Sequence, residues 1–173
     1  MPGEEVRPTP DKLRETLFNI LGAAVDGAVF LDAYAGTGAV GIEALSRGAR
    51  QAIFIEKNRK AANLIQANLS SLGIENRARV IVGSALLYLG GGACNADIVF
   101  LDPPYSKERE YQAALDALGA APPSLVVVQH SKRLELAEEY GALRRTRIVI
   151  QSDNALSFFR PIASVAQAEE EAA

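Results

Sequence analysis

Residues 29–41 read Val-Phe-Leu-Asp-Ala-Tyr-Ala-Gly-Thr-Gly-Ala-Val-Gly, and this stretch decides the fold. Its first three residues form an apolar run, which predicts a short buried β-strand that ends at Asp32. Gly36, Gly38 and Gly41 then predict a tight loop that leads into a helix at about 38–47. A strand, a glycine-rich loop and a helix in direct succession are typical of the first unit of a doubly wound α/β fold.

The same alternation of short apolar strands and helices continues along the chain. Further strands are predicted at 52–55, 80–82, 98–101 and 125–128, and further helices at 10–22, 61–69 and 108–119. Such strands form a parallel sheet covered on both faces. Two last strands, at 143–151 and 154–161, are separated only by Ser152-Asp153, so they are expected to pair as an antiparallel hairpin. The predicted fold is therefore an α/β, Rossmann-like class I methyltransferase fold. Its seven-stranded, mostly parallel sheet ends in a C-terminal antiparallel hairpin and carries helices on both faces.

Composition limits the kind of protein. The chain has 173 residues, 49% of them hydrophobic, so it can bury a full core, and a single domain is expected over residues 1–163. Residues 1–6 would be a short N-terminal extension of it, and residues 164–173, rich in Ala and Glu, are expected to form a disordered acidic tail. No apolar run reaches the ~20 residues of a membrane span, and the first residues lack the order of a signal peptide. A cytoplasmic protein with no membrane partner is expected.

Two residue types that occur once exclude several kinds of chemistry. Cys94 is the only cysteine, which rules out an internal disulfide and zinc sites built on several cysteines, and no metal is expected. His130 is the only histidine. A Ser-His-Asp catalytic triad is disfavoured, because it needs its histidine beside a nucleophile, so His130 is expected to be structural or at the surface. The net charge of −3 includes three glutamates at 169–171, and without them it is near zero. Charge therefore neither supports nor excludes a nucleic-acid partner.

Two acids stand at the ends of consecutive predicted strands, where a ligand site is expected. Asp32 ends the first strand, and Glu56 ends the second, 20 residues beyond Gly36. The spacing of the glycines matches a dinucleotide fingerprint, but in that motif the first glycine follows directly on the strand, so that a pyrophosphate can lie at the helix N-terminus. Here the Asp32 carboxylate would repel a pyrophosphate and suits the ammonium group of a methionine moiety, while Glu56 can accept both ribose hydroxyls. The residues favour an adenosyl cofactor, with S-adenosyl-L-methionine ahead of NAD.

The tetrapeptide Asp102-Pro103-Pro104-Tyr105 follows the fourth predicted strand, at the sheet edge where doubly wound folds bind ligands. An exocyclic amine of a nucleobase is a poor nucleophile, because its lone pair is delocalised into the ring. The Asp102 carboxylate and the Pro103 carbonyl can each accept one N–H, which favours a tetrahedral nitrogen whose lone pair points at the methyl group. Tyr105 can stack on the base. Guanine presents N1–H and N2–H₂ as adjacent donors that suit an acceptor-only carboxylate, so the residues lean towards guanine, although Asp also occurs at this position in adenine methyltransferases.

Together these segments resemble the bacterial small-subunit ribosomal RNA guanine-N2 methyltransferase D family, from Arg7 to about Arg160. The resemblance rests on specific blocks: Arg-Pro-Thr at 7–9, Arg-Glu-Thr-Leu-Phe-Asn at 14–19, Asp-Ala-Tyr-Ala-Gly-Thr-Gly at 32–38, Gly-Ile-Glu-Ala-Leu-Ser-Arg-Gly-Ala at 41–49, Asp-Pro-Pro-Tyr at 102–105 and Ala-Leu-Ser-Phe at 155–158. The block at 41–49 and the Arg-Pro-Thr helix distinguish this family from other amino methyltransferases.

The resemblance implies a role for individual residues. Cofactor contacts are implied for Asp32, Ala33, Gly36, Thr37, Gly38, Glu56, Lys57, Ser84 and Ala85, the last two beside the adenine. The target guanine, in 16S rRNA within a 30S particle, would be held by Asp102, Pro103 and Tyr105, with Pro104 near the substrate. Arg7 and Thr9 would flank the cofactor or the RNA, and a monomer is expected.

Two departures from the family pattern stand out. Only six residues precede Arg7, where the family usually carries a short basic β-hairpin, so that hairpin is absent from this sequence. The sequence Gln-Ser-Asp-Asn at 151–154 stands where the family tends to have Tyr-Gly-Asp-Thr, so no substrate role is carried over to this turn.

Other activities remain open beside methylation of a guanine N2. The nearest are methylation of adenine N6 in DNA or RNA, or of a protein glutamine. Those enzymes usually have Asn in place of Asp102, and the DNA enzymes need a further target-recognition segment that 173 residues hardly accommodate. An NAD-dependent oxidoreductase is disfavoured by Asp32 before the glycines and by the Asp-Pro-Pro-Tyr turn. A catalytically silent binding module is disfavoured by the intact cofactor and tetrapeptide residues.

Overall fold

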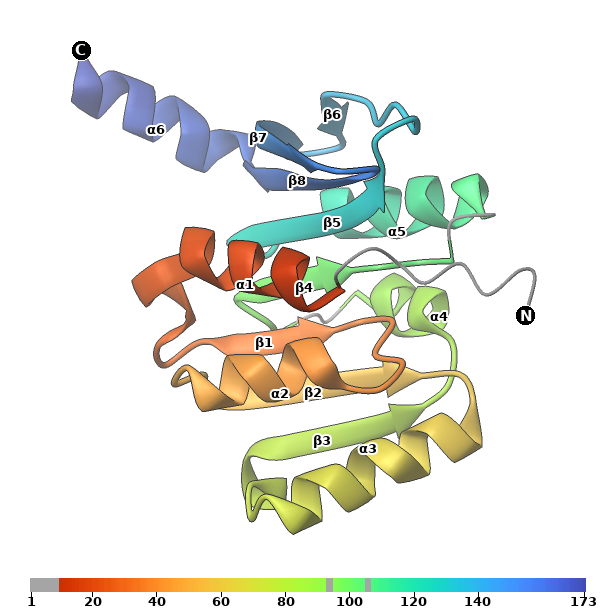
Figure 1. The fold of residues 1–173 in the computed structure, drawn as a ribbon. Coiled ribbons are helices and arrows are strands. Elements are labelled where there is room, and N and C mark those ends of the chain that lie inside the picture. The colour runs from red at the N-terminus through yellow and green to blue at the C-terminus, as the bar shows by residue number, and fades with distance from the viewer. Residues whose placement is uncertain (1–9, 93–94, 105–106) are drawn as a thin grey trace.

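The computed structural model describes residues 10–92, 95–104 and 107–173, which build one mixed sheet covered by helices (Figure 1). Helix α1 (Pro10–Leu21) and the 3₁₀ helix η1 (Gly22–Val25) precede the first strand. The elements that follow are β1 (Val29–Asp32), α2 (Ala39–Ser46), β2 (Gln51–Glu56), α3 (Arg59–Ser71), η2 (Glu75–Arg77), β3 (Ala78–Val82), α4 (Ala85–Gly90), β4 (Ile98–Leu101), α5 (Glu108–Ala120), β5 (Leu125–Ser131), β6 (Glu139–Tyr140), β7 (Leu143–Gln151), β8 (Asn154–Pro161) and α6 (Ile162–Ala172).

The strands are arranged in the order β3-β2-β1-β4-β5-β8-β7-β6. Strands β1 to β5 are parallel to one another, and β8 pairs antiparallel with both β5 and β7. The predicted sheet of five parallel strands and a terminal hairpin is confirmed, with Ser152 at φ 54° in the hairpin turn. The two-residue strand β6, in which Tyr140 lies opposite Leu143, adds an eighth strand at the edge. A strand this short leaves no periodicity in the sequence, so it was not predicted.

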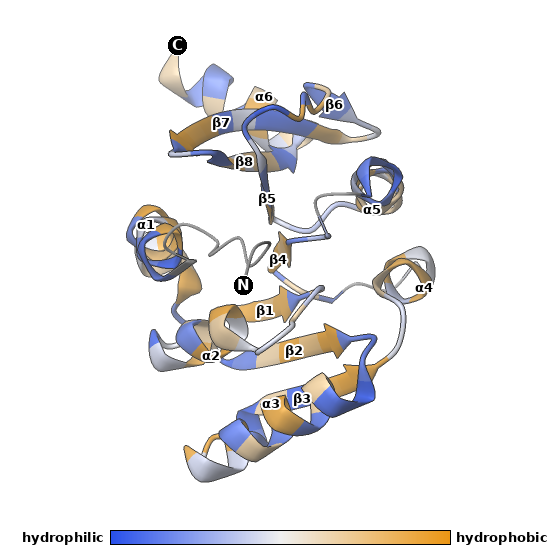
Figure 2. Cartoon of the chain, turned by 45° about the vertical axis from the view of Figure 1, so that its right-hand side comes forward, coloured by the Kyte–Doolittle hydropathy of each residue, from blue (hydrophilic) through white to orange (hydrophobic). Residues whose placement is uncertain are grey.

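Each face of the sheet carries its own hydrophobic core. Successive side chains of a strand point to opposite faces: Phe30 packs in the core beneath α1, α2 and α3, whereas Val29 and Leu31 pack in the core beneath α4 and α5. Figure 2 shows α1 and α2 on one side of the hydrophobic central strands and α4 and α5 on the other. No helix in the described part of the chain is both long enough and apolar enough to cross a membrane.

Strand β1 lies at the point where the chain changes direction across the sheet. Its two neighbours are β2 and β4, with Asp32 opposite Phe54 on one side and opposite Phe100 on the other. In a doubly wound fold a crevice forms at the carboxyl ends of the strands at such a point. Glu56 at the end of β2 and Asp102 after β4 are therefore placed on either side of Asp32.

The C-terminal tail differs from the prediction. Residues 164–173 were expected to be disordered, but helix α6 extends to Ala172 and projects from the end of β8 (Figure 1). None of its residues is buried, so packing does not account for the helix. Ala, Glu and Gln are strong helix formers, and the Gln167 side-chain amide donates to Glu171 one turn later at 3.2 Å. A tail rich in Ala and Glu thus favours an exposed helix.

Candidate active site

A cavity of about 1150 Å³ opens at the carboxyl ends of the central strands. Most of the predicted site residues line it: Asp32, Ala33, Gly36, Thr37, Glu56, Lys57, Ser84, Ala85, Asp102 and Pro104. Other elements complete the wall with residues that the sequence analysis did not assign: Asp11, Leu13, Arg14 and Leu17 from α1, Glu110 from α5, Gln129 from β5 and Asn154 from β8. The fold thus gathers the predicted acids of three separate strand ends around one space.

Asp32 is an acid in the interior of the protein. Its side chain is 1% exposed, and its Oδ2 accepts a hydrogen bond of 3.1 Å from the backbone N–H of Gly41 in the first turn of α2. Burial raises the pKa of Asp32 to about 7; the Gly41 N–H opposes this rise, and the carboxylates of Asp102 and Glu56 add to it. A cationic group bound at this carboxylate would offset the lost solvation, so the position suits a ligand ammonium.

Glu56 is fixed by the backbone on two sides. Its Oε1 accepts from the N–H of Gly36 at 3.1 Å, and its Oε2 accepts from the N–H of Asn58 at 2.6 Å. The loop that carries Gly36 is itself anchored to β2, because the N–H of Ala35 donates to the carbonyl of Ile55 at 2.9 Å. An ionised carboxylate has about four lone-pair sites, so each oxygen of Glu56 can still accept a ligand hydroxyl. Two such acceptors side by side suit the vicinal hydroxyls of a ribose.

The glycines of the loop serve different purposes. Gly36 has φ +55°, lines the cavity, and has no protein atom within 4 Å of the place a Cβ would take, which leaves room for a ligand. Gly38 has φ +82°, and a Cβ there would lie 3.1 Å from Ile65 of α3. A Cβ at Gly41 would lie 2.4 Å from the ring of Phe54. Gly38, although predicted as a cofactor contact, does not line the cavity; backbone conformation and packing explain its identity.

The acidic turn after β4 is tied to α5 by a tyrosine. Asp102 and Pro104 line the cavity, whereas Pro103 is buried and does not. The hydroxyl of Tyr111, a residue of α5 that is 1% exposed, donates to the carbonyl oxygen of Pro103 at 3.2 Å and lies 3.3 Å from the carbonyl oxygen of Gln129. The carbonyl of Pro103, predicted to accept a substrate N–H, therefore already uses one of its two lone pairs within the protein.

A second tyrosine joins the two sides of the cavity. Tyr34 lies in the loop after β1, and its hydroxyl donates to Oε1 of Glu110, in the first turn of α5, at 2.9 Å. Burial, followed by the neighbouring Glu110, raises the pKa of Tyr34 well above its usual range. Both residues line the cavity. Their hydrogen bond links the glycine loop directly to the helix that follows the acidic turn.

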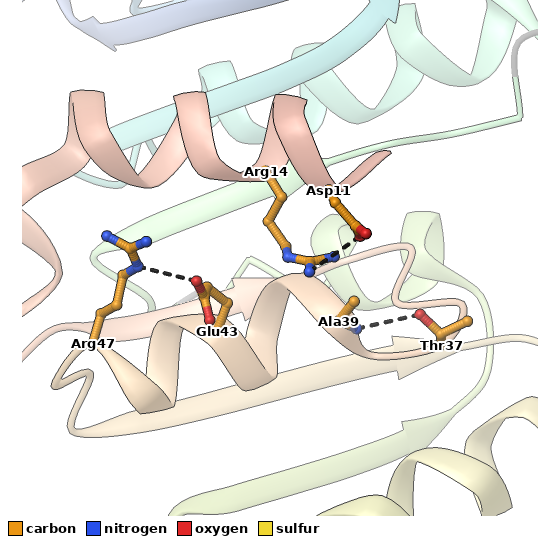
Figure 3. Close-up of polar contacts among 6 residues, drawn as sticks. All are labelled: Asp11, Arg14, Thr37, Ala39, Glu43 and Arg47. Atoms are coloured by element: carbon orange, nitrogen blue, oxygen red, sulfur yellow. Dashed lines mark hydrogen bonds and ion pairs between the residues drawn. The ribbon is translucent and has the colours of Figure 1, made fainter. Parts of the chain in front are cut away.

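Two further predicted residues, Ser84 and Thr37, accept backbone hydrogen bonds at the starts of helices, and three others lie outside the described residues. Ser84 is the N-cap of α4, where its Oγ accepts from the N–H of Leu87 at 3.3 Å. Thr37 Oγ1 accepts from the N–H of Ala39 at 3.4 Å at the start of α2 (Figure 3). Three predicted residues lie outside the described residues: Arg7, Thr9 and Tyr105.

His130, expected from the sequence to be either structural or at the surface, is a buried structural residue. It is 1% exposed and does not line the cavity. Its Nδ1 lies 2.8 Å from the Ser131 carbonyl oxygen, to which it donates, and its Nε2 accepts from the Ser157 hydroxyl at 2.8 Å. Burial lowers the pKa of His130, and Arg145 acts in the same direction, against the effect of the Ser131 carbonyl. Across residues 10–92, 95–104 and 107–173, no three His, Cys, Asp or Glu side chains are grouped to bind a metal ion.

The strand order and the acids at the ends of β1, β2 and β4 define a class of protein. A parallel sheet with its strand reversal at β1, completed by an antiparallel hairpin, is the sheet of the class I methyltransferases, and the predicted fold class is confirmed.

The chain belongs to the family described as Conserved hypothetical protein 95, whose model matches residues 1–160. YlbH of Bacillus subtilis (strain 168), provisionally named an rRNA methyltransferase, is 37% identical over an alignment of 152 residues; the match covers 84% of this chain and 82% of that protein. Ribosomal RNA small subunit methyltransferase D of Escherichia coli (strain K12) is 43% identical over 102 residues; the match covers 59% of this chain and about half, 51%, of that relative. A solved Escherichia coli structure, provisionally named the methyltransferase YhhF, is 31% identical with a TM-score of 0.79, covering 90% of this chain and 87% of that one. The resemblance found in the sequence is thereby confirmed.

Proposed function

We propose that this protein transfers the methyl group of S-adenosyl-L-methionine to the exocyclic N2 of a guanine in 16S rRNA, acting as a monomer on a 30S particle. One observation carries the proposal: Asp102 lines the same cavity as Asp32 and Glu56. An acceptor for an amine thus lies beside acids that suit an adenosyl cofactor. The names of YlbH and of the small subunit methyltransferase D refer to ribosomal RNA, which supports the substrate class.

The residues of the cavity fit this cofactor. Ligand pockets commonly enclose about 300–1000 Å³, so a cavity of about 1150 Å³ has room for the cofactor and a base together. Asp32 suits the ammonium group, Glu56 suits the ribose hydroxyls, and Ser84 lies at the N-terminus of α4 for contact with the adenine. When bound, the cofactor supplies an electrophilic methyl group on a positively charged sulfur.

The protein's own part in the reaction is to hold and orient the amine. Asp102 accepts one N–H of the target, and the second lone pair of the Pro103 carbonyl accepts the other. These two bonds favour a tetrahedral nitrogen and direct its lone pair at the methyl carbon. The target nitrogen would gain positive charge as it accepts the methyl group, and Asp102 would stabilise this charge and could take up the proton that the nitrogen releases.

Guanine suits this acid better than adenine does. In guanine the N2 amine stands beside N1–H, so two adjacent donors face one carboxylate, which accepts only. In adenine the amine stands beside a ring acceptor, which would face the carboxylate unfavourably and would suit an Asn side chain.

The test is methyl transfer from labelled S-adenosyl-L-methionine to 30S subunits that lack their own guanine-N2 methylation, with naked 16S rRNA, DNA and ribosomal proteins in parallel. We expect the label in N2-methylguanosine after digestion of the subunits, and none with Asp102→Ala. Label in N6-methyladenosine or in glutamine would replace guanine by that acceptor. Cofactor binding without label in any of these substrates would contradict the proposal.

A further inference from the structure

The amino-acid end of the proposed cofactor carries two opposite charges. Asp32 accounts for the ammonium group, but nothing described so far accounts for the α-carboxylate one carbon away. A carboxylate that enters a partly buried site needs a cation or several N–H donors in place of water. The cavity contains such a cation on the wall formed by α1.

Arg14 extends from α1 into this wall. It lines the cavity together with Thr37, Ala39 and Val40 from the opposite side, and its side chain is 27% exposed. Figure 3 shows the Arg14 guanidinium pointing from α1 towards the start of α2, with Asp11 beside it. Its charge thus lies on the side of the cavity where the glycine loop leads into α2.

The other cations of the cavity belong to different parts of it. Among the described residues that line the cavity, the Lys and Arg residues are Arg14, Lys57 and Lys107. Lys57 directly follows Glu56, on the side proposed for the ribose. Lys107 belongs to the acidic turn, where its N–H donates to the carbonyl of Pro104 at 3.0 Å. Arg14 is the cation that faces the glycine loop from α1.

The present partner of Arg14 is easily exchanged. Its Nη2 lies 3.3 Å from Oδ1 of Asp11, and the Asp11 side chain is 89% exposed. Such a pair contributes little to stability, because water screens it and solvates both groups when it opens. A ligand carboxylate can instead bind the planar guanidinium with two parallel hydrogen bonds. The N-terminal end of α2, which carries partial positive charge, favours an anion on the same side.

We propose that Arg14 binds the α-carboxylate of the cofactor's methionine moiety, whose ammonium group is assigned to Asp32 in the same cavity, and so makes the cavity selective for a complete amino-acid end. This inference rests on the proposed function, since it assigns one more contact to the same cofactor. It also gives a purpose to the Arg-Glu-Thr-Leu-Phe-Asn block at 14–19, whose first residue the fold places in the cavity.

A second arginine offers a matched control. Arg47 makes a similar intrahelical pair, with its Nε 3.2 Å from Oε1 of Glu43, and its side chain is 38% exposed. It packs over the ring of Phe18, 5.3 Å from the centroid, and does not line the cavity. Figure 3 shows both pairs between α1 and α2. Removal of Arg47 thus deletes a similar charge and ion pair without touching the proposed site.

The experiment compares two ligands that differ only in the carboxylate. Calorimetry measures binding of S-adenosylhomocysteine and of its decarboxylated analogue, S-adenosyl-3-thiopropylamine, to the full chain and to Arg14→Ala, Arg14→Lys and Arg47→Ala. We expect Arg14→Ala to weaken binding of S-adenosylhomocysteine at least ~10-fold, as for loss of a charge-assisted pair. The dissociation constant of the analogue should stay within ~2-fold of its value for the unaltered protein. Arg14→Lys should weaken only S-adenosylhomocysteine and by less, and Arg47→Ala should change neither. Melting temperatures of all variants show whether each is folded.

Each other outcome overturns the inference. Equal weakening of both ligands by Arg14→Ala would show a general role in the fold of the site, and unchanged binding of both would place the carboxylate elsewhere. If Arg14→Ala instead spared both ligands and raised the KM for RNA, the guanidinium would serve an RNA phosphate. Failure of the unaltered protein to bind either nucleoside would contradict the proposed function itself, whereas normal binding that Arg14→Ala leaves intact would contradict this inference alone.

Discussion

The two halves of the cavity are organised by different kinds of hydrogen bond. In the cofactor half, which contains the ends of β1 and β2, backbone N–H groups fix the acids. Asp32 accepts from Gly41, and Glu56 accepts from Gly36 and Asn58. Gly36 and Asn58 lie in the loops that follow β1 and β2, and Gly41 lies in the first turn of α2, so short segments that follow the two strands supply the supports of both acids.

In the target half, which contains the acidic turn after β4, side chains from a helix provide the support. Tyr111 holds the carbonyl of Pro103, and Glu110 receives the hydroxyl of Tyr34. These contacts depend on how α5 is rotated and seated against the sheet. Substitutions in the two halves should therefore affect different quantities. Those near Asp32 and Glu56 should change the affinity for the cofactor, and those near Asp102 should change the rate of methyl transfer.

The largest effect is expected for Asp102→Ala. Loss of the acceptor for the amine should reduce kcat by ~10²–10³-fold, which is the scale for removing one group that stabilises developing charge. The dissociation constant of S-adenosylhomocysteine should stay within a few-fold, because the supports of the cofactor half remain. Single-turnover methyl transfer and calorimetry measure the two quantities. Asp116→Ala, at an exposed position of α5, is the control and should change neither; a near-normal rate in Asp102→Ala would refute the assigned role.

Glu56→Ala should produce the opposite pattern. Loss of the ribose hydrogen bonds should weaken binding of the cofactor by ~1–3 kcal/mol, while kcat at saturating cofactor stays close to normal. Because Glu56 also supports Gly36 and Asn58, Glu56→Gln is the sharper variant: it keeps the shape of the side chain and loses the charge. Equilibrium binding and steady-state kinetics give both values, with Glu75→Ala as the exposed control. An unchanged dissociation constant in both Glu56 variants would place the ribose elsewhere.

A pH titration tests the cofactor half through Asp32. Its pKa is raised to about 7 from an ordinary 3.8, so the acid is largely neutral below pH 7, whereas a ligand ammonium needs the charged form. Affinity for S-adenosylhomocysteine should therefore rise with pH, by ~10-fold between pH 6 and pH 8. Calorimetry at constant ionic strength measures this, and Asp32→Asn should bind weakly and independently of pH over this range. A flat profile in the unaltered protein would show that the carboxylate is charged throughout.

The raised pKa of Asp32 also predicts how the free energy of unfolding changes with pH. Because the pKa of Asp32 is higher in the folded protein, the folded state binds more protons between pH 4 and pH 7. The contribution of Asp32 to the free energy of unfolding should accordingly fall as pH rises across this window. Asp32→Asn should remove that contribution, which urea unfolding of the two proteins at a series of pH values can measure.

The contrast between the halves also explains what the sequence could predict. Asp32, Glu56 and Asp102 were predicted because each stands at or directly after the end of an apolar strand, and parallel strands end at one edge of a sheet. The backbone N–H groups that support Asp32 and Glu56 belong to the segments that directly follow the two strands, so their position does not depend on distant parts of the sequence. The C-terminal tail was mispredicted because a segment rich in Ala and Glu favours an exposed helix as much as it suggests disorder, and composition alone does not decide between them.

The side-chain supports of the target half could not be predicted in this way. The sequence predicts the helix at 108–119, but not which carbonyl the Tyr111 hydroxyl meets, since that depends on the rotation of the helix against the sheet. Arg14 presents the same difficulty in α1. The periodicity assigns a helical face, whereas the function of a polar atom on that face is set by partners distant in the sequence.

The smallest effect is expected for Tyr111→Phe, and it isolates the support of the acidic turn. The variant deletes one hydroxyl, 3.2 Å from the Pro103 carbonyl, and leaves the ring in place. We expect kcat to fall by ~2–10-fold, the equivalent of one hydrogen bond, with unchanged affinity for the cofactor. Tyr140→Phe is the matched control: Tyr140 is 5% exposed, and its hydroxyl accepts from the N–H of Ala137 at 2.9 Å, outside the cavity. Both variants should lose a similar free energy of unfolding, but only Tyr111→Phe should lose kcat. A similar fall of kcat in both would mean that Tyr111 acts through general stability and not through the position of the Pro103 carbonyl.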